Sequence, residues 1–176
     1  MTEEQDKALD VVKIAIQMEI DGKEFYLKAS KESSNELGKN LLQKLAEEED
    51  YHRRKFVQIY DAMRVKKSWP IVDFQPDNGQ KLRTIFAEAT DKLESDVKPI
   101  DTELEVIQMA MDLENKSLDF YKSRSENAAV SDEKEFYEML ANEEREHHLI
   151  LLDYYDYLKD PAGWFTKKEH PSLDGG

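Results

Sequence analysis

Two copies of a Glu-x-x-His motif are the residues of this chain whose types and spacing best suit chemistry. The first copy lies in the segment LAEEEDYH and joins Glu49 to His52, and the second lies ninety-five residues later in LANEEREH and joins Glu144 to His147. Residues three apart on a helix project from the same face, one turn from each other. A carboxylate and an imidazole held in this way can bind one metal ion together. In a chain rich in glutamate, a single Glu-x-x-His motif is weak evidence for a metal site. Two copies in corresponding segments are stronger evidence.

The repeat extends upstream and adds one glutamate to each copy. At the same offset of ninety-five residues, Glu19 corresponds to Glu114, and the segment around each of them also matches. Each half therefore holds a Glu followed, thirty residues later, by a Glu-x-x-His. Alignment without gaps indicates an internal duplication of a helix pair. The candidate metal ligands are Glu19, Glu49, His52, Glu114, Glu144 and His147.

The composition narrows the classes of protein and of chemistry. The 176 residues suit a single domain, and a charged fraction of 36% with few Gly and Pro favours helices. With 0 cysteines, disulfides, zinc–thiolate sites, iron–sulfur clusters and thiol catalysis are excluded. The net charge of −14 disfavours binding to nucleic acid or to an anionic membrane. The chain has no run of about 18 apolar residues and begins with an acidic segment, so we expect no membrane span and a cytoplasmic location.

Four amphipathic helices must position the candidate ligands. Apolar periodicity predicts helices over about 5–33, 36–65 and 101–128, and a fourth that Ser131 or Asp132 caps and that ends near residue 160. The two helix pairs thus cover about 5–65 and 101–160. The repeat fails over 66–100, which we interpret as a long crossover inside one domain of residues 1–165, with a short helix possible over 80–95. We expect the tail, 166–176, to be flexible.

The candidate ligands interrupt otherwise apolar seams, and these seams should be buried together in an all-α four-helix bundle. Four carboxylates in a dry core cannot all stay ionised unaided, because each buried unpaired charge costs several kcal/mol. Two divalent cations would neutralise them, and mixed carboxylate and imidazole ligation suits iron or manganese. We also expect Ile71, Met109 and Leu113 to be buried with the seams.

On these six positions and their two-fold register, the chain resembles the ferritin-like di-iron superfamily, and within it the rubrerythrin-related proteins, over about residues 5–160. The resemblance implies a ferritin-like bundle with two iron ions, although manganese or a mixed pair is also possible. It further implies that Glu49 and Glu144 bridge both metals, that Glu19 and His52 complete one site, and that Glu114 and His147 complete the other. One departure stands out: many rubrerythrins carry a further Glu one turn after the third-helix ligand, where this chain has Ser117, with Gly22 as its counterpart.

The function implied by the resemblance is that of an oxidoreductase in which ferrous iron reacts with hydrogen peroxide or dioxygen, as in oxidative stress. Because the chain has no cysteine for a rubredoxin-type iron, the electrons should come from an external electron donor. A homodimer is the default assembly. Two alternatives stay open: an iron-handling protein without catalytic turnover, and a structural bundle that a metal stabilises.

Several neighbours of the candidate ligands have a plainer interpretation. Tyr26 and Tyr121 lie seven residues after the first glutamate of each half, and we expect core tyrosines, although they could hydrogen-bond a ligand. Glu48 and Glu143 precede the bridging candidates, and we expect them to point to solvent or to a flanking helix. His148 has no acidic partner at the ligand spacing and should lie at the surface.

Overall fold

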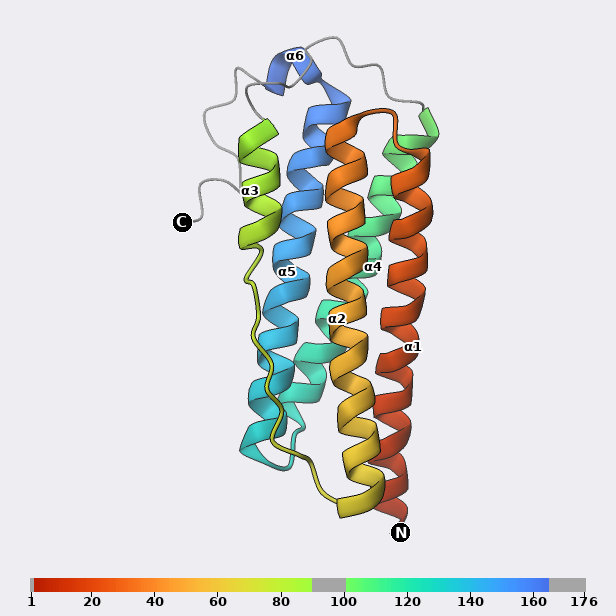
Figure 1. Ribbon diagram of the computed structural model, residues 1–176, viewed down its shortest axis with the longest axis vertical. Helices are drawn as coiled ribbons and strands as arrows, with labels where there is room; N and C mark the ends of the chain where they lie inside the picture. Colours follow the sequence, from red (N-terminus) through yellow and green to blue (C-terminus); the bar gives the residue numbers. More distant parts are fainter. Residues whose placement is uncertain (1, 90–100, 165–176) are drawn as a thin grey trace.

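The described part of the computed structural model, residues 2–89 and 101–164, is built of helices and connecting segments. In Figure 1 the long helices run along one axis, with a shorter helix beside them and a helical turn at one end. They are α1 (Glu3–Glu32), α2 (Glu36–Lys66), α3 (Gln80–Ala89), α4 (Asp101–Glu126), α5 (Ser131–Lys159) and α6 (Pro161–Trp164). The all-α prediction is confirmed. The predicted tail and residues 90–100 of the crossover lie outside the described residues.

Local sequence signals explain where the first two helices begin. Thr2 and Gln5 form a capping box at the start of α1, since each side chain bonds the backbone of the other. The Asn35 side chain accepts a hydrogen bond from the backbone N–H of Gly38 at 2.8 Å and caps α2. Lys67 ends α2 in the left-handed conformation, with φ of 56°.

The start of α5 differs from the prediction. Its N-cap is Val130, whose side chain makes no capping hydrogen bond, and Ser131 is already the first helical residue. The Glu133 side chain instead accepts a hydrogen bond from the backbone N–H of Ala129 at 3.3 Å. The expected cap at Ser131 or Asp132 is therefore wrong, because a carboxylate inside the first turn satisfies a free N–H ahead of the helix.

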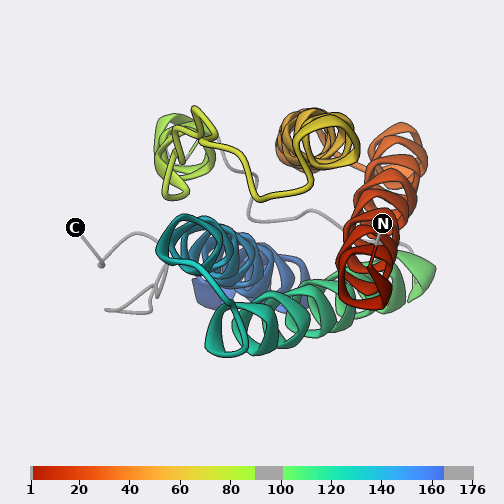
Figure 2. The same ribbon diagram turned by 90° about the horizontal axis from the view of Figure 1, so that it is seen from below.

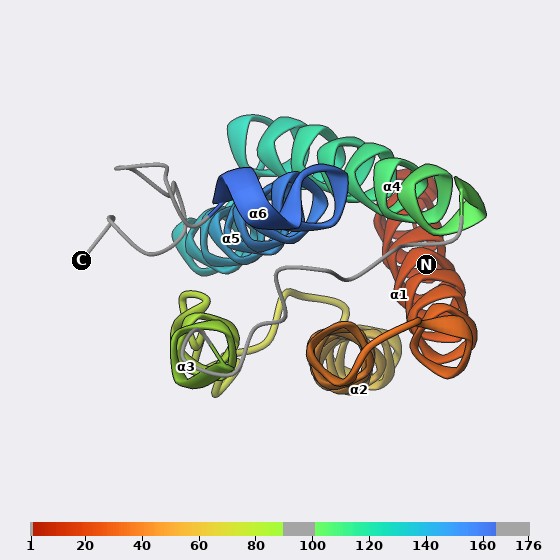
Figure 3. The same cartoon turned by 90° about the horizontal axis from the view of Figure 1, so that it is seen from above.

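The long helices form two antiparallel pairs. α1 packs along α2 and α4 packs along α5, and the end-on views in Figures 2 and 3 show the two pairs facing each other. α3, which lies within the crossover, packs beside α2 and α5. None of the helices in the described residues has the length and apolar character that a membrane span requires.

The buried apolar residues form two clusters, one toward each end of the bundle. One cluster contains Leu41, Leu45 and Tyr154, and the other contains Phe56 and Leu140. In α2 and α5, the candidate ligands lie between these two clusters along the helix. Apolar packing on both sides therefore holds the backbone of the ligand layer in place.

Three residues expected in the core are exposed. Met109 and Leu113 lie on the outer face of α4, exposed by 55% and 39%, because the buried face of that helix runs through Ala110 and Glu114. Ile71 in the crossover is 92% exposed, whereas Phe74 is buried and stacks on Tyr51, with ring centroids 5.6 Å apart. Phe74, together with Trp69, whose ring packs against Phe136 and Tyr137, thus anchors this part of the crossover.

Candidate metal centre

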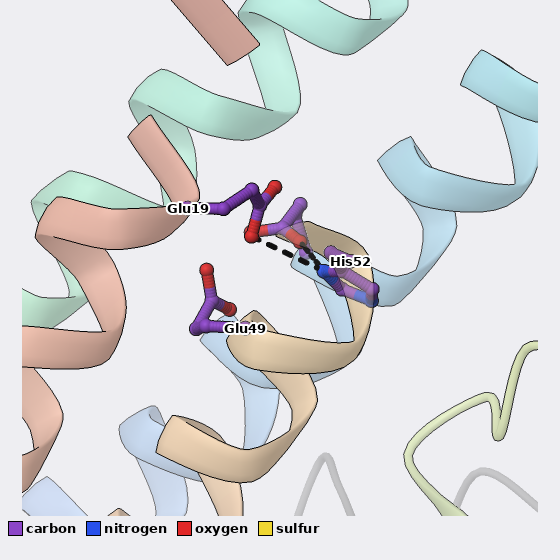
Figure 4. A group of neighbouring side chains, drawn as sticks. Glu19, Glu49 and His52 are labelled. Atoms are coloured by element: carbon purple, nitrogen blue, oxygen red, sulfur yellow. Dashed lines mark ion pairs between the residues drawn. The ribbon is translucent and has the colours of Figure 1, made fainter. Parts of the chain in front are cut away.

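All six candidate ligands meet in the middle of the bundle. Glu19 comes from α1, Glu49 and His52 from α2, Glu114 from α4, and Glu144 and His147 from α5. Each is buried, with exposed fractions from 0% to 4%. Figure 4 shows Glu19, Glu49 and His52 pointing toward one another from two helices. Sequence spacing thus found residues that the fold brings together.

The six side chains form two overlapping groups. In each group, one nitrogen or oxygen atom per residue lies within 4.8 Å of every other. Glu49 and Glu144 belong to both groups. One group adds Glu19 and His52, and the other adds Glu114 and His147. A pair of cations could therefore share the two central carboxylates.

The two groups have nearly the same geometry. Nδ1 of His52 lies 3.4 Å from Glu19 Oε2 and 3.2 Å from Glu144 Oε1. Nδ1 of His147 lies 3.4 Å from Glu114 Oε1 and 3.2 Å from Glu49 Oε1. The two imidazole rings stack, with centroids 5.9 Å apart and planes 12° apart. The duplication in sequence is thus preserved as an approximate two-fold arrangement of ligand atoms.

The donor atoms of this centre fit a metal pair. Buried polar atoms normally have hydrogen-bond partners. Within the six candidate ligands, seven buried atoms have none: Glu19 Oε2, Glu49 Oε1, His52 Nδ1, Glu114 Oε2, Glu144 Oε1, Glu144 Oε2 and His147 Nδ1. Four carboxylates and two imidazoles are the kinds of ligand that iron and manganese prefer. The four negative charges of the carboxylates also balance the four positive charges of two divalent cations.

Without cations, protons must compensate the buried charge. Burial and the neighbouring carboxylates raise the pKa of Glu49 and of Glu144 well above the usual value. Burial lowers the pKa of His52, but the adjacent Glu19 carboxylate outweighs this effect and raises the pKa to about 9. The pKa of His147 is likewise raised well above its usual value, because Glu114 outweighs the effect of burial. The metal-free centre therefore retains protons that cations would displace.

Two tyrosines tie the halves of the repeat together. The Tyr26 hydroxyl donates a hydrogen bond to Glu114, and the Tyr121 hydroxyl donates one to Glu19. Each bond runs from one half of the repeat to the first glutamate of the other half. Burial and the adjacent carboxylate raise the pKa of both hydroxyls. They are buried, as expected of core tyrosines, and they also orient candidate ligands.

Two further glutamates are more buried than the sequence suggested. Glu48 and Glu143 are exposed by only 8% and 2%, so the solvent alternative is wrong for both, whereas contact with a neighbouring helix is what Glu48 makes. Glu48 Oε2 lies 2.6 Å from Nε2 of His147 on the facing helix α5. Glu143 Oε1 accepts a hydrogen bond from the backbone N–H of Asn78 at 2.6 Å. The available signal was their correspondence in the repeat, because both precede the shared glutamate.

A small cavity reaches the centre between α1 and α4. Its volume is about 90 Å³, and its lining includes Gly22, Ser117, Glu49 and Glu114. A Cβ atom at position 22 would come within 2.9 Å of Glu49 Oε2. The small residue at position 22 therefore leaves room beside a shared carboxylate.

The comparisons with known proteins agree with the fold and the residue cluster. A family model described as Rubrerythrin matches residues 10–159 of the chain. Searches of curated proteins and of solved structures found no significant match. The matched segment contains all six candidate ligands and all four long helices in large part. The chain therefore belongs to the rubrerythrin family.

Proposed function

We propose that this protein is a di-iron oxidoreductase of the peroxidase or ferroxidase type, with hydrogen peroxide or dioxygen as its oxidant. The observation that carries the proposal is the pair of overlapping groups that share Glu49 and Glu144, since seven of their buried nitrogen and oxygen atoms have no hydrogen-bond partner. When bound, two ferrous ions would supply the two electrons that reduce hydrogen peroxide, with two protons, to two molecules of water.

The ligand assignment follows from the two groups. We propose that Glu49 and Glu144 bridge both irons, that Glu19 and His52 complete one site, and that Glu114 and His147 complete the other. The hydroxyls of Tyr26 and Tyr121 hold the two terminal carboxylates in orientation. Oriented ligands lower the cost of reorganisation when the charge at the centre changes.

The small cavity between α1 and α4 gives a small oxidant room beside the centre. Its volume of about 90 Å³ admits molecules of the size of hydrogen peroxide or dioxygen next to Glu49 and Glu114. At position 117 the hydroxyl of Ser117 takes the place of a further carboxylate. We therefore propose a reaction in which the ligand set stays constant at the six residues.

The electron donor and the setting of the reaction are also proposals. The 176 residues contain no cysteine that could hold a second iron centre. We therefore propose that a separate electron donor returns the iron to the ferrous state. We further propose a homodimer in the cytoplasm with a role in oxidative stress. Ile14 on α1 and Met109 and Leu113 on α4 are exposed apolar side chains that a second copy could cover.

Rapid mixing tests the proposed reaction. The protein, loaded with ferrous iron, is mixed with hydrogen peroxide and separately with oxygenated buffer, while the near-ultraviolet absorption of ferric iron is followed. We expect oxidation by at least one oxidant to be faster than that of free ferrous iron in the same buffer. Tight iron binding with no faster oxidation would refute the enzyme and leave iron handling without turnover.

Variants test the ligand assignment. Glu49→Ala or Glu144→Ala should abolish binding of both metals, because each removes a shared carboxylate. Glu19→Ala should mainly weaken one site. Glu47→Ala is the matched control, since Glu47 lies on the same helix and is exposed. Equal losses in all three ligand variants would contradict the bridging roles.

A further inference from the structure

The two histidines of the centre differ on the side that faces away from it. Nδ1 of His147 faces Glu49 and Glu114, and its Nε2 lies 2.6 Å from Glu48 Oε2. Because Nδ1 is directed to the proposed metal, Nε2 carries the proton and donates it to Glu48. His147 is fully buried and Glu48 is 8% exposed. The contact is therefore a buried, charge-assisted hydrogen bond.

His52 lacks the corresponding contact. By the repeat, its partner would be Glu143, the counterpart of Glu48. Glu143 instead accepts a hydrogen bond from the backbone N–H of Asn78. In the part of the chain that the structure describes, no hydrogen bond reaches Nε2 of His52. Its ring packs edge-on against Phe74, 5.9 Å between centroids, and borders a cavity of about 470 Å³ that opens under the crossover.

The crossover is the cause of this difference. Asn78 and Gly79 form a turn with φ of 56° and 74°, which directs the N–H of Asn78 toward α5. A hydrogen bond of 3.0 Å from Asn142 Nδ2 to Asn78 Oδ1 fixes the same turn. A Cβ atom at Gly79 would also meet Glu146 Cβ at 2.9 Å, so the turn lies close against the helix. The turn of the crossover thus binds Glu143 on α5. It makes no such bond to Glu48 on α2, which bonds His147 instead.

A carboxylate on the far nitrogen of a ligand histidine has a known effect. It fixes the tautomer and the ring orientation and makes the metal-binding nitrogen more basic, and its loss costs roughly 10–100-fold in metal affinity. Glu143 also lies within 4.8 Å of the polar atoms of Glu48 and His147, which adds negative charge on this side. The group of Glu48, Glu143 and His147 thus supports a ligand and does not form a third cation site, since Nε2 is occupied.

We propose that Glu48 is a positioning residue that makes the two metal sites unequal. The ion held by Glu114 and His147 binds first and more tightly, and the ion held by Glu19 and His52 binds second. This inference rests on the proposed metal centre. It predicts ordered loading in a site whose six ligand residues are symmetric.

Titration with cobalt(II) tests the order of loading. Calorimetry and the visible absorption of bound cobalt should resolve two steps in the wild-type protein. Glu48→Gln keeps the shape and removes the charge, so the tighter step should weaken by about 10–100-fold while the weaker step stays in place. Glu47→Gln is the matched control, because Glu47 lies on the same helix as Glu48 but is exposed and belongs to neither ligand group, and both steps should change little.

Two further measurements keep the outcomes separate. Glu19→Ala should retain the tight binding step, and Glu114→Ala should lose it. These two variants test the order of loading even if Glu48→Gln does not fold. In the zinc-loaded protein, one histidine ring N–H resonance should lie far downfield and move upfield in Glu48→Gln. Two equal steps in the wild type, or equal effects of Glu48→Gln and Glu47→Gln, would overturn the inference. Absence of any cobalt binding would instead refute the metal centre itself.

Discussion

The pH dependence of stability in the metal-free protein is the most direct consequence of the buried centre. His52 is 1% exposed, and its pKa is raised from 6.5 to about 9, because Glu19 outweighs the opposing effect of burial. In the unfolded chain the imidazole loses its proton near the ordinary pKa. The folded protein therefore binds more protons than the unfolded chain between these two values, and its free energy of unfolding must fall as the pH rises.

The size of the effect follows from the shift. A shift of one pKa unit corresponds to about 1.4 kcal/mol, so His52 alone should remove about 3 kcal/mol of stability between pH 6.5 and about 9. This stability is fully present below pH 6.5. The raised pKa of His147 adds a loss of the same sign. Glu49 and Glu144 also lower the free energy of unfolding as the pH rises, and their effect begins at lower pH. The reason is that their carboxyl groups lose the proton at a lower pH in the unfolded chain than in the folded protein.

Urea unfolding of the chelator-treated protein, followed by circular dichroism at several pH values across this window, measures the loss. His52→Gln should flatten the dependence. His148→Gln is the control, since His148 belongs to neither ligand group, and it should keep the full slope. A metal-free protein whose stability is constant or rises over the window would refute the proton compensation of the centre.

Two more predictions concern the loaded protein. At about pH 7, binding of two divalent ions should release protons from the centre, because the two shared glutamates and the two histidines have raised pKa values. Calorimetry in buffers of different ionisation enthalpy counts these protons, and binding without proton release would contradict the assignment. Gly22→Ala places a Cβ 2.9 Å from Glu49 Oε2, so metal-binding free energy should weaken by about 1–3 kcal/mol in a cobalt titration, whereas Ser117→Ala should bind as the wild type does.

The fold and the composition of the cluster could be predicted because both depend on periodic features. Glu19 and Glu49 stand on apolar seams, and the repeat gives each a counterpart, so the burial of one helix face also buries them. The bounds of the long helices follow from caps such as Thr2 and Asn35, and they differ from the predicted bounds by only a few residues. Helix periodicity and capping residues are therefore sufficient to predict the long helices and the six buried ligand positions.

The remaining features depend on contacts between elements, which periodicity does not encode. Glu48 is buried because His147 lies opposite it on another helix. Glu143 is buried because a turn of the crossover covers it. Met109 was expected inside, but the buried face of α4 is narrower than its apolar residues suggest. Each error therefore traces to an assumption made about one helix alone.

The hydrogen bonds of Tyr26 and Tyr121 cross between the halves of the repeat, and this crossing bears on the history of the chain. One helix pair supplies only Glu19, Glu49 and His52 to its ligand group, and Glu144 must come from the other pair. A half-length ancestor could thus have built the whole centre only as a two-fold dimer, with each tyrosine reaching into the partner. Fusion of two such copies would then have turned a contact between molecules into a contact within one chain.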